Sequence, residues 1–531
     1  MDLSVWRQLA ATARLTRDFP RFARSTVSRD VARARVQERL HLRERVFLHT
    51  ARRTLFANPH SPYRRLLAHA GCTHQDLARL VQQEGLDGAL LVLARHGVYV
   101  TQAELKGRLP IVRGSLRFSA APGSFDNPLV KPHFVVPTSG SSGRQLFVGR
   151  SLAELAEIGE MLTLALETFG VDRPAYVKWS TLPHAMVEKL HLGQPIIGWF
   201  NPLGGIPMWV RALQVWVWGT ARASGVRIAF PRTLPLTRPD ALASWQGAAL
   251  QHHAQILIDA TASSATRVSA AATARGLSLA GLTWIPWGEP LTAMQHQTIA
   301  ASGAQSLPVY STVETGPVAM ACGSRVESDA MHLRRERFAV TPAMHAVAPA
   351  PAVGASAPSV PLAVTSLGPN APKILLNAET GDSASFLEGQ CGCTLDDLGL
   401  TWRIATIRSI EKLTGEGITL VGSDVVAIID ELLPHTYGGR QGDYQLVETV
   451  GHDGVTRLVL RVHPGLPEID AAHIRTTVLD ALAVQSAGNQ HAARLLDAVS
   501  SLGVEQCAPW IAASGKVPAF VPLRATVGTR P

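Results

Sequence analysis

The sequence is poor in cysteine and in long apolar runs. Five cysteines in 531 residues are too few and too unevenly spaced for a disulfide framework. No stretch of about 18 uninterrupted apolar residues occurs, so we find no membrane-spanning helix and expect no membrane partner. The Walker A pattern G-x-x-x-x-G-K-[ST] is also missing, which argues against a P-loop nucleotide fold.

The amino-terminal thirty residues lack the compact apolar core of a secretory signal. Their scattered arginines and few acids resemble a transit peptide, but the same pattern continues into segments with the composition of ordinary helices. We therefore expect a cytoplasmic protein.

Positive charge is present but not concentrated in any nucleic-acid-binding pattern. The net charge of +9 is spread over the chain, and no basic stripe with interleaved aromatic residues or known binding module occurs. We expect no nucleic-acid partner. The arginines of the first 65 residues have the spacing of a solvated helical face: Arg33, Arg35, Arg39, Arg43, Arg45, Arg52 and Arg53.

Length and pattern predict a layered α/β protein of more than one domain. Residues 1–110 have mainly helical periodicity. From about 130 to 320, short apolar runs alternate with Ala/Leu-rich helical patterns. Strands are expected at residues 228–230, 255–258 and 282–286.

The last third of the chain has a different pattern. A segment rich in Ala, Pro, Val and Ser, residues 346–361, is typical of a linker, and short β-like runs follow at 362–364, 374–376 and 418–421. Alternating runs at 444–448 and 457–462 predict a small terminal α+β domain with an Ala-rich helix.

A loop rich in glycine and hydroxyl groups has the chemistry of a phosphate site. Its glycines allow close backbone approach, exposed amides of a tight turn can form an anion-binding nest, and one arginine adds charge. We place it between an extended run at 134–136 and a helix starting near Ser151; the plain alternative is a flexible surface loop. The residues are Thr138, Ser139, Gly140, Ser141, Ser142, Gly143 and Arg144.

Cysteine and histidine positions suggest a metal site. Cys322 and His332, followed by Cys391 and Cys393, supply three thiolates and one imidazole, a set suited to a tetrahedral structural zinc ion. Because all four ligands would come from the protein, the ion would have no open position for catalysis. The alternative is four unrelated residues, since C-x-C is a weaker signal than C-x2-C.

Several separated segments, in this order, resemble the adenylate-forming superfamily of acyl-CoA synthetases, luciferases and nonribosomal adenylation domains, and most closely its phenylacetate-CoA ligase-like branch. The similarity runs from about residue 58 to residue 516. Its motifs are Asn58–Tyr63, the loop Thr138–Gln145, Trp287-Gly288-Glu289-Pro290-Leu291, Tyr310-Ser311-Thr312-Val313-Glu314, Thr380-Gly381-Asp382, Arg408–Glu411 and Gly515-Lys516.

The resemblance implies a role for each of these segments. The loop at 138–144, Gly288, Glu289, Tyr310, Ser311 and Thr312 would bind ATP; Asp382 and Arg408 would contact ribose or phosphate. Glu314 would hold Mg²⁺, and Lys516 would stabilise the transition state of adenylation. Some members of this branch carry zinc at the place of the cysteine and histidine set described above.

The same resemblance implies a hinged two-part architecture. Residues 1–110 would form a helical region packed on the large adenylate-forming domain of residues 111–409, which includes the inserted zinc segment. Residues 410–531 would form a small mobile domain that rotates about Ile410 and Glu411.

Some positions depart from the family pattern. Arg144 stands where lysine is usual, Ser311 replaces a glycine, and Val313 occupies the place of a phosphate-binding hydroxyl. Ile410 falls where one of two hinge acids is expected. Asn377-Ala378-Glu379 replaces the basic and aromatic residues that usually precede T-G-D.

The expected activity is ATP-dependent activation of a carboxylic acid, followed by transfer of the acyl group to a thiol. That thiol would belong to coenzyme A or to the phosphopantetheine of a carrier protein. An aromatic acid is the first candidate for the substrate. Two alternatives remain at this point: an adenylating ligase with an amine or hydroxyl acceptor, and a non-catalytic nucleotide-binding member.

Overall fold

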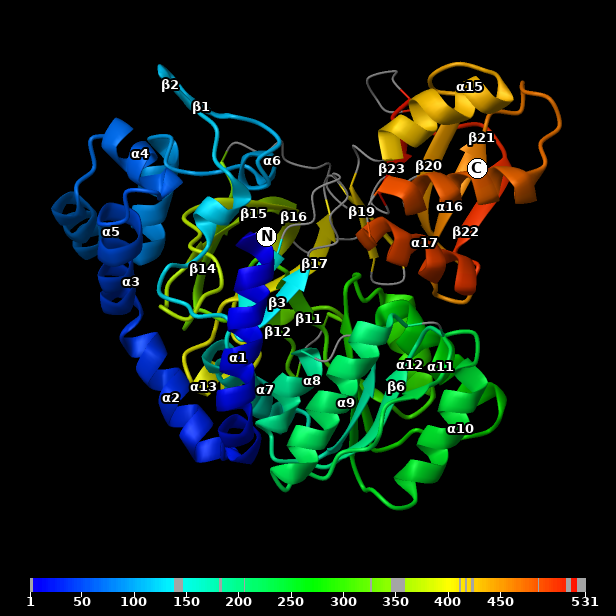
Figure 1. The fold of residues 1–531 in the computed structure, drawn as a ribbon, viewed down its shortest axis with the longest axis horizontal. Helices are drawn as coiled ribbons and strands as arrows, with labels where there is room; N and C mark the ends of the chain where they lie inside the picture. The colour runs from blue at the N-terminus through cyan, green and yellow to red at the C-terminus, as the bar shows by residue number, and fades with distance from the viewer. Residues whose placement is uncertain are drawn as a thin grey trace.

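A computed structural model of the chain describes residues 3–137, 147–180, 184–204, 206–324, 327–344, 359–409, 412–415, 418–421, 425–485, 487–511 and 517–522. Figure 1 shows a large body with a smaller one above it. None of the helices in the described ranges has the length and apolarity that crossing a bilayer requires.

The amino-terminal region is helical, as predicted. It contains α1 (Leu3–Arg24), α2 (Arg29–His41), α3 (Arg43–Ala51), η1 (Arg52–Phe56), α4 (Pro62–His69), α5 (His74–Arg95) and α6 (Gln102–Leu105). Thr73 starts α5 with a capping box, and Gly85, at a φ of 68°, kinks it. The apolar faces of α3, η1, α4, α5 and α6 share one core with residues 374–376, whereas those of α1 and α2 pack in another core.

The prediction that the amino-terminal arginines form a solvated face is confirmed for Arg45, Arg52 and Arg53, which are exposed. It is wrong for the arginines that are half-buried in ion pairs with other elements. Arg35 and Arg39 both pair with Glu160 of α7 (Leu152–Thr168) at 2.7 Å. Arg33 pairs with Glu167, and Arg43 with Asp87. These cations attach the first helices to the large body.

A six-stranded parallel sheet forms one layer of the large body. Its order is β10-β9-β8-β5-β6-β7, and apolar side chains of α7, α8 and α9 pack on one face and those of α10, α11 and α12 on the other. This architecture confirms the predicted α/β alternation. The strands are β5 (Ala175–Trp179), β6 (Ile196–Asn201), β7 (Arg232–Thr233), β8 (Ile256–Thr261), β9 (Leu282–Trp287) and β10 (Gln305–Ser306); the helices are α8 (His184–Leu190), α9 (Met208–Ala223), α10 (Pro239–Leu250), α11 (Ala262–Ala274) and α12 (Ala293–Ala301).

A seven-stranded antiparallel sheet forms a second layer, in the order β11-β12-β13-β17-β16-β15-β14. It brings the segments around residues 310, 332, 382 and 408 into one sheet. The strands are β11 (Val309–Thr312), β12 (Gly316–Met320), β13 (Met331–Leu333), β14 (Phe338–Pro342), β15 (Ser359–Ser366), β16 (Ala378–Leu387) and β17 (Arg403–Ser409).

Three local predictions were wrong. Residues 228–230 form only an isolated bridge, between Ile228 and Ile196, and residues 374–376 form no strand. The chain on either side of the glycine-rich loop forms an antiparallel hairpin, β3 (Phe134–Pro137) with β4 (Phe147–Arg150), so the loop joins two strands and not a strand to a helix. Helix α7 begins only after β4, with Ser151 as its N-cap.

The carboxyl-terminal part is a small α+β domain, as predicted. After the hairpin β18 (Lys412–Gly415) and β19 (Ile418–Val421), a sheet of order β22-β21-β20-β23 carries α16 and α17 on one side (Figure 1). Its elements are η3 (Ala427–Leu432), α15 (Leu433–Tyr437), β20 (Tyr444–Val450), β21 (Thr456–Val462), α16 (Ala471–Gln485), α17 (Ala487–Ala498), β22 (Leu502–Gln506) and β23 (Phe520–Val521). Most of the predicted linker, residues 345–358, lies outside the described ranges.

Candidate functional site

Tyr310 and Asp382 meet although three strands separate β11 from β16 in the sheet. The tyrosine hydroxyl donates to Oδ2 of Asp382 at 3.0 Å, and the backbone amide of Asp382 donates to Oγ1 of Thr380 at 3.1 Å. Burial, followed by the charge of Asp382, raises the pKa of Tyr310 well above its usual value, and the nearby Glu314 contributes in the same direction. The arrangement keeps Tyr310 protonated and two acidic side chains close together.

Gly381 allows the turn that presents Asp382. Its φ is +73°, a region that favours glycine, and a Cβ there would lie 3.0 Å from the side chain of Gln102. Gln102, on α6, donates to the carbonyl of Thr380 at 2.7 Å. An amino-terminal helix therefore braces the turn.

Arg408 lies one strand away from this pair. In the register of β16 and β17 it stands opposite Ser383, next to the Asp382–Ser409 pair. Its Nη1 lies 3.4 Å from Oδ2 of Asp329, so the side chain is held at the end of β17.

A buried ion pair supports the turn after β11. Arg150, at the end of β4, pairs with the fully buried Glu154 and donates from Nη2 to the carbonyl of Val313 at 2.9 Å. Burial raises the pKa of Glu154, which the Arg150 charge opposes. The strand that follows the glycine-rich loop is thus tied to the segment that carries Glu314.

The carboxylate of Glu289 faces α11. Its oxygens accept from the amide and hydroxyl of Ser263 at 2.7 and 2.9 Å. The same hydroxyl oxygen accepts from the backbone amide of Thr456, the first residue of β21, at 3.2 Å. Glu289 is therefore linked through Ser263 to the small domain, while Gly288 before it adopts a φ of +81°.

The opposite end of the small sheet carries the chain next to Lys516. Gln445, near the start of β20, donates to the carbonyl of Pro518 at 2.9 Å. Strand β20 runs from there to the turn before Thr456, a length of about 20 Å at the usual rise per residue. The small domain thus docks on the large one with the end that is remote from Pro518.

The four predicted metal ligands come together in a second cluster. Their ligand atoms all lie within 4.8 Å of one another. Sγ of Cys322 lies 3.6 Å from Sγ of Cys391, and Nε2 of His332 lies 3.3 and 3.4 Å from the sulfurs of Cys391 and Cys393. Tetrahedral zinc with its usual bond lengths places two sulfur ligands about 3.8 Å apart, so the spacing fits this ion.

Groups outside the cluster orient its ligands. Nδ1 of His332 donates to the carbonyl of Leu400 at 2.6 Å, which leaves Nε2 facing the sulfurs. Asp396, on α13 (Thr394–Asp397), accepts the amides of Cys391 and Gly392 at 2.7 Å each. These supporting contacts are typical of a built metal site.

Two of the three thiols of the cluster are poor acids without a cation, whereas the hydrogen bond with Cys393 lowers the pKa of Cys322. Burial raises the pKa of Cys391 to about 11, and the hydrogen bond with Cys322 raises the pKa of Cys393 to about 11. A bound divalent cation deprotonates coordinating thiols outright, which would turn these crowded groups into ligands.

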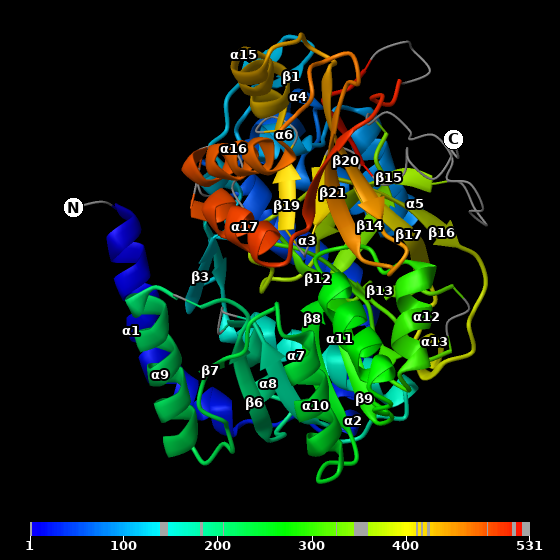
Figure 2. The same cartoon turned by 90° about the vertical axis from the view of Figure 1, so that its right-hand side faces the viewer.

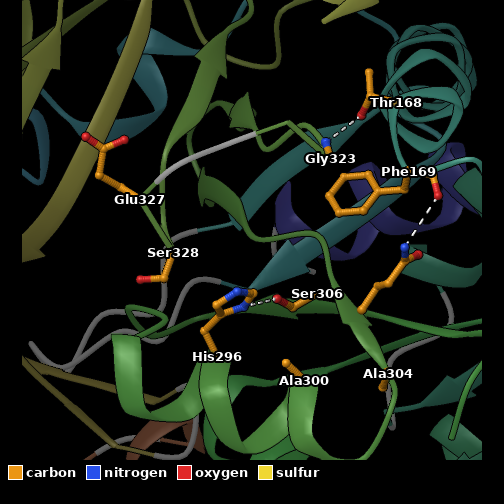
Figure 3. Close-up of a pocket in the computed structure, with 10 residues that line it drawn as sticks. Thr168, Phe169, His296, Ala300, Ala304, Ser306, Gly323, Glu327 and Ser328 are labelled. Carbon is orange, nitrogen blue, oxygen red and sulfur yellow. Dashed lines mark hydrogen bonds between the residues drawn. The ribbon is translucent and has the colours of Figure 1, made fainter. Parts of the chain in front are cut away.

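A separate cavity of about 300 Å³ is lined in part by Gly323, the residue that follows Cys322 (Figure 3). His296 donates to or accepts from Oγ of Ser306 at 3.0 Å on one side, and the amide of Gly323 donates to Oγ1 of Thr168 at 2.9 Å on another. Neither Tyr310 nor Asp382 lines this cavity, so it is distinct from the region around those two residues.

Comparisons of this chain with known proteins by sequence and by structure give different results. No family model and no curated protein sequence matches the chain. Among solved structures, a 2-hydroxyisobutyryl-CoA ligase in complex with 2-HIB-AMP and CoA, in the thioesterification state, matches with a TM-score of 0.52 and 18% identity, over 94% of this chain and 91% of its own. This chain has the fold of the adenylate-forming CoA ligases.

Two other matches are weaker. A malonyl-CoA ligase with methylmalonyl-CoA and AMP bound matches over 84% of this chain and 94% of its own, at 17% identity and a TM-score of 0.41. An o-succinylbenzoate CoA synthetase from Bacillus subtilis matches over 75% and 69%, at 11% identity and a TM-score of 0.40. Scores this low add nothing to the assignment of the adenylate-forming fold.

Within this adenylate-forming fold, part of the predicted site lies outside the described residues. This holds for the loop from Thr138 to Arg144 and for Lys516. Ser311 is exposed, and Oγ1 of Thr312 shares a hydrogen bond of 2.9 Å with Thr315.

Sequence reasoning missed the supporting residues. Gln102, Arg150, Ser263 and Asp396 belong to no motif. The first three act on motif residues that are 26 or more positions away in the sequence, and Asp396 acts on Cys391, five positions before it. Only Asp396 left a local signal, because it follows the C-x-C pair by three residues.

Proposed function

We propose that the chain is an ATP-dependent, AMP-forming acid–thiol ligase. The observation that carries the proposal is the hydrogen bond between Tyr310 and Asp382, which are 72 residues apart in the sequence, in a chain with the fold of the adenylate-forming CoA ligases. Glu314 follows the strand of Tyr310 by two residues. The 2-hydroxyisobutyryl-CoA ligase with this fold was crystallised with an acyl adenylate and CoA, which supports adenylation followed by thioester formation.

In the first step, the acid would attack the α-phosphate of ATP and release pyrophosphate. Asp382 would accept both ribose hydroxyls, because a carboxylate offers two acceptor oxygens; Tyr310 holds one of these oxygens in place. Arg408 and the loop at 138–144 would neutralise phosphate charge, and Lys516 would stabilise the charge that develops between acid and α-phosphate.

Glu314 would hold Mg²⁺, which prefers carboxylate oxygen. Its side chain is partly exposed beside the Tyr310–Asp382 pair, as a site for a phosphate-bound cation requires. Bound there, the ion would screen the charge of the leaving pyrophosphate.

In the second step, the small domain would rotate about residues 410–411 and a thiol would take the acyl group. The adenylate would lose AMP as the carbonyl carbon passes from phosphate oxygen to sulfur. We propose coenzyme A as the first acceptor to test, with a carrier-protein thiol second. The phenylacetate-CoA ligase-like branch, aromatic acids as substrates and a cytoplasmic location remain predictions that rest on the motifs and composition.

We further propose that Cys322, His332, Cys391 and Cys393 bind a structural zinc ion. The spacing of the ligand atoms, the fixed tautomer of His332 and the carboxylate of Asp396 behind the C-x-C turn support this. The ion would link β12, β13 and the segment before α13, and so stabilise the sheet that carries Tyr310 and Asp382.

Acid-dependent exchange of labelled pyrophosphate into ATP tests the proposed first step. A panel of aromatic, short-chain hydroxy and long-chain acids should contain at least one that stimulates exchange. Absence of exchange with every class of acid, in protein that is folded and zinc-loaded, would favour the non-catalytic alternative. Exchange without thioester formation on CoA would instead point to a carrier-protein, amine or hydroxyl acceptor.

Replacement of Asp382 tests the nucleotide contact. Asp382→Ala should raise the KM for ATP in the exchange assay by about 100-fold, since it removes two hydrogen bonds to a charged acceptor. Glu388→Gln, at an exposed acid of the same strand region, should leave the KM unchanged. Equal KM values for Asp382→Ala and the unaltered protein would contradict the assignment.

Replacement of Ser263 tests the contact between domains. Ser263→Ala removes the acceptor of the Thr456 amide and should slow thioester formation by a factor of about 3 to 10, because the docked arrangement keeps the Pro518 end away from the large domain. Pyrophosphate exchange should fall less than thioester formation, because the backbone amide of Ser263 still donates to Glu289. Thr273→Ala, at an exposed position of the same helix, serves as the control; an equal loss of both half-reactions in Ser263→Ala would contradict a role in docking.

A further inference from the structure

Helix α9 presents an apolar face to solvent. Most surface helices turn charged or polar side chains outward, but Met208 is 86% exposed, Trp209 67% and Val215 42%. The inner face of the helix is formed by other residues, including the buried Val210 and Val217. The exposed apolar groups are therefore not needed for the core.

Aromatic rings lie on both flanks of the exposed side of the helix, because Trp209 and Trp218 are nine residues apart and so point in opposite directions across it. Phe230 is 48% exposed and packs edge-to-face on Trp218, with ring centroids 5.2 Å apart. Trp216 packs on Phe19 of α1 with centroids 5.8 Å apart. Figure 2 shows α1 and α9 side by side at the outer edge of the large body. We call Met208, Trp209, Val215, Trp218 and Phe230 the α9 surface.

The stretch of sequence that carries the α9 surface has charge of one sign. No aspartate or glutamate occurs between Lys189 and Pro239, and Asp18 of the adjacent α1 is paired with Arg17 and His133. Four cations of the stretch are exposed: Arg211, Arg222, Arg227 and Arg232. The surface thus combines apolar aromatic groups with positive charge.

We propose that the α9 surface binds the surface of a membrane that contains anionic phospholipids. Tryptophan partitions to the boundary between headgroups and acyl chains, and arginines beside it can bind lipid phosphates while their stems remain in apolar contact. A helix that lies at the edge of the molecule (Figure 2) can enter this boundary along its length, as interfacial helices do.

A second copy of the chain fits the α9 surface less well than an anionic lipid surface does. In a two-fold dimer the same patch meets itself, so Arg211 and its neighbours would face arginines with no acid in the stretch to pair with. Like charges across an interface cost binding energy. A lipid surface supplies the missing negative charge.

Binding to the surface of a membrane differs from crossing the bilayer. The expectation of no membrane partner rested on the lack of a long apolar segment, which bears on bilayer crossing alone. Attachment through α9 would use side chains on the exposed side of a 16-residue helix.

The test is sedimentation of the full chain with vesicles. One set contains phosphatidylcholine alone and the other an equal mixture of phosphatidylcholine and phosphatidylglycerol. We expect binding to the anionic vesicles only, weakened by salt, and reduced about tenfold or more in Trp209→Ser and in Arg211→Glu. Val484→Ser, at an 84% exposed apolar position of the small domain, should bind as the unaltered chain does.

Three results would overturn the proposal. They are no binding to anionic vesicles, binding that Trp209→Ser leaves unchanged, and a dimer in light scattering that Trp209→Ser dissociates without any vesicle binding. The last would assign the α9 surface to a second copy. Because the assay uses no ATP or acid, its outcome is independent of the proposed ligase activity.

Discussion

Lys516→Ala is expected to reduce acid-dependent pyrophosphate exchange by a factor of about 100 to 1000, the effect of losing one positioned charge at an active centre. Transfer of the acyl group from a preformed acyl adenylate to CoA should change little. This difference between the two half-reactions follows from the proposed rotation of the small domain. In the docked arrangement Pro518, two residues after Lys516 in the sequence, lies at the end of β20 that is remote from the contact with the large domain.

The control for this prediction is Arg440→Ala, which removes an exposed cation of the same small domain. Exchange and transfer should both persist in it. If Lys516→Ala lost both half-reactions equally, or neither, the separate use of Lys516 in adenylation would be refuted.

Cys393→Ser is expected to lose zinc and to destabilise the protein by about 4 kcal/mol or more, the range seen when a structural metal is lost. The change is nearly isosteric, so the packing around this buried side chain is preserved. Elemental analysis should fall from about one zinc per chain, and the unaltered protein treated with a chelator should show a similar drop in thermal stability.

Cys72→Ser provides the matched control. Cys72 is half-buried and lies outside the cluster, so zinc content and stability should stay near those of the unaltered chain. Well under one zinc per chain in protein purified without chelator, or equal stability of Cys393→Ser with and without zinc, would refute the site.

The motifs predicted the fold because their order along the chain carries the information. Each motif is short, yet seven segments between Asn58 and Lys516 occur in the order of one superfamily, and the resulting architecture matches. The cysteine and histidine ligands could also be predicted from the sequence, since few residue types bind zinc and cysteine is rare in this chain.

Contacts between segments that lie far apart in the sequence could not be predicted from it. Tyr310 and Asp382 each stood in a motif, but their hydrogen bond depends on the order and register of the seven-stranded sheet. Arg39 was interpreted as a solvated residue because its partner Glu160 lies more than 100 residues away in the sequence, on α7. The spacing of residues in the sequence predicts which side chains are neighbours on one helix. It does not predict which side chains of another helix or strand pack against them.

Short apolar runs gave the wrong local structure for a physical reason. Ile374–Leu376 is buried against the amino-terminal helices, and burial alone gives a three-residue run no strand or helix period. The short strand β4 was missed after the glycine-rich loop, although its Val148 is fully buried, because four residues are too few to show alternation.

The products formed from ATP test the central proposal most directly. Mass spectrometry after incubation of the zinc-loaded protein with ATP, Mg²⁺, the exchange-active acid and CoA should show AMP, pyrophosphate and the acyl-CoA in equal amounts. ADP with phosphate, or ATP that stays intact while the protein remains folded, would contradict an acyl-adenylating ligase.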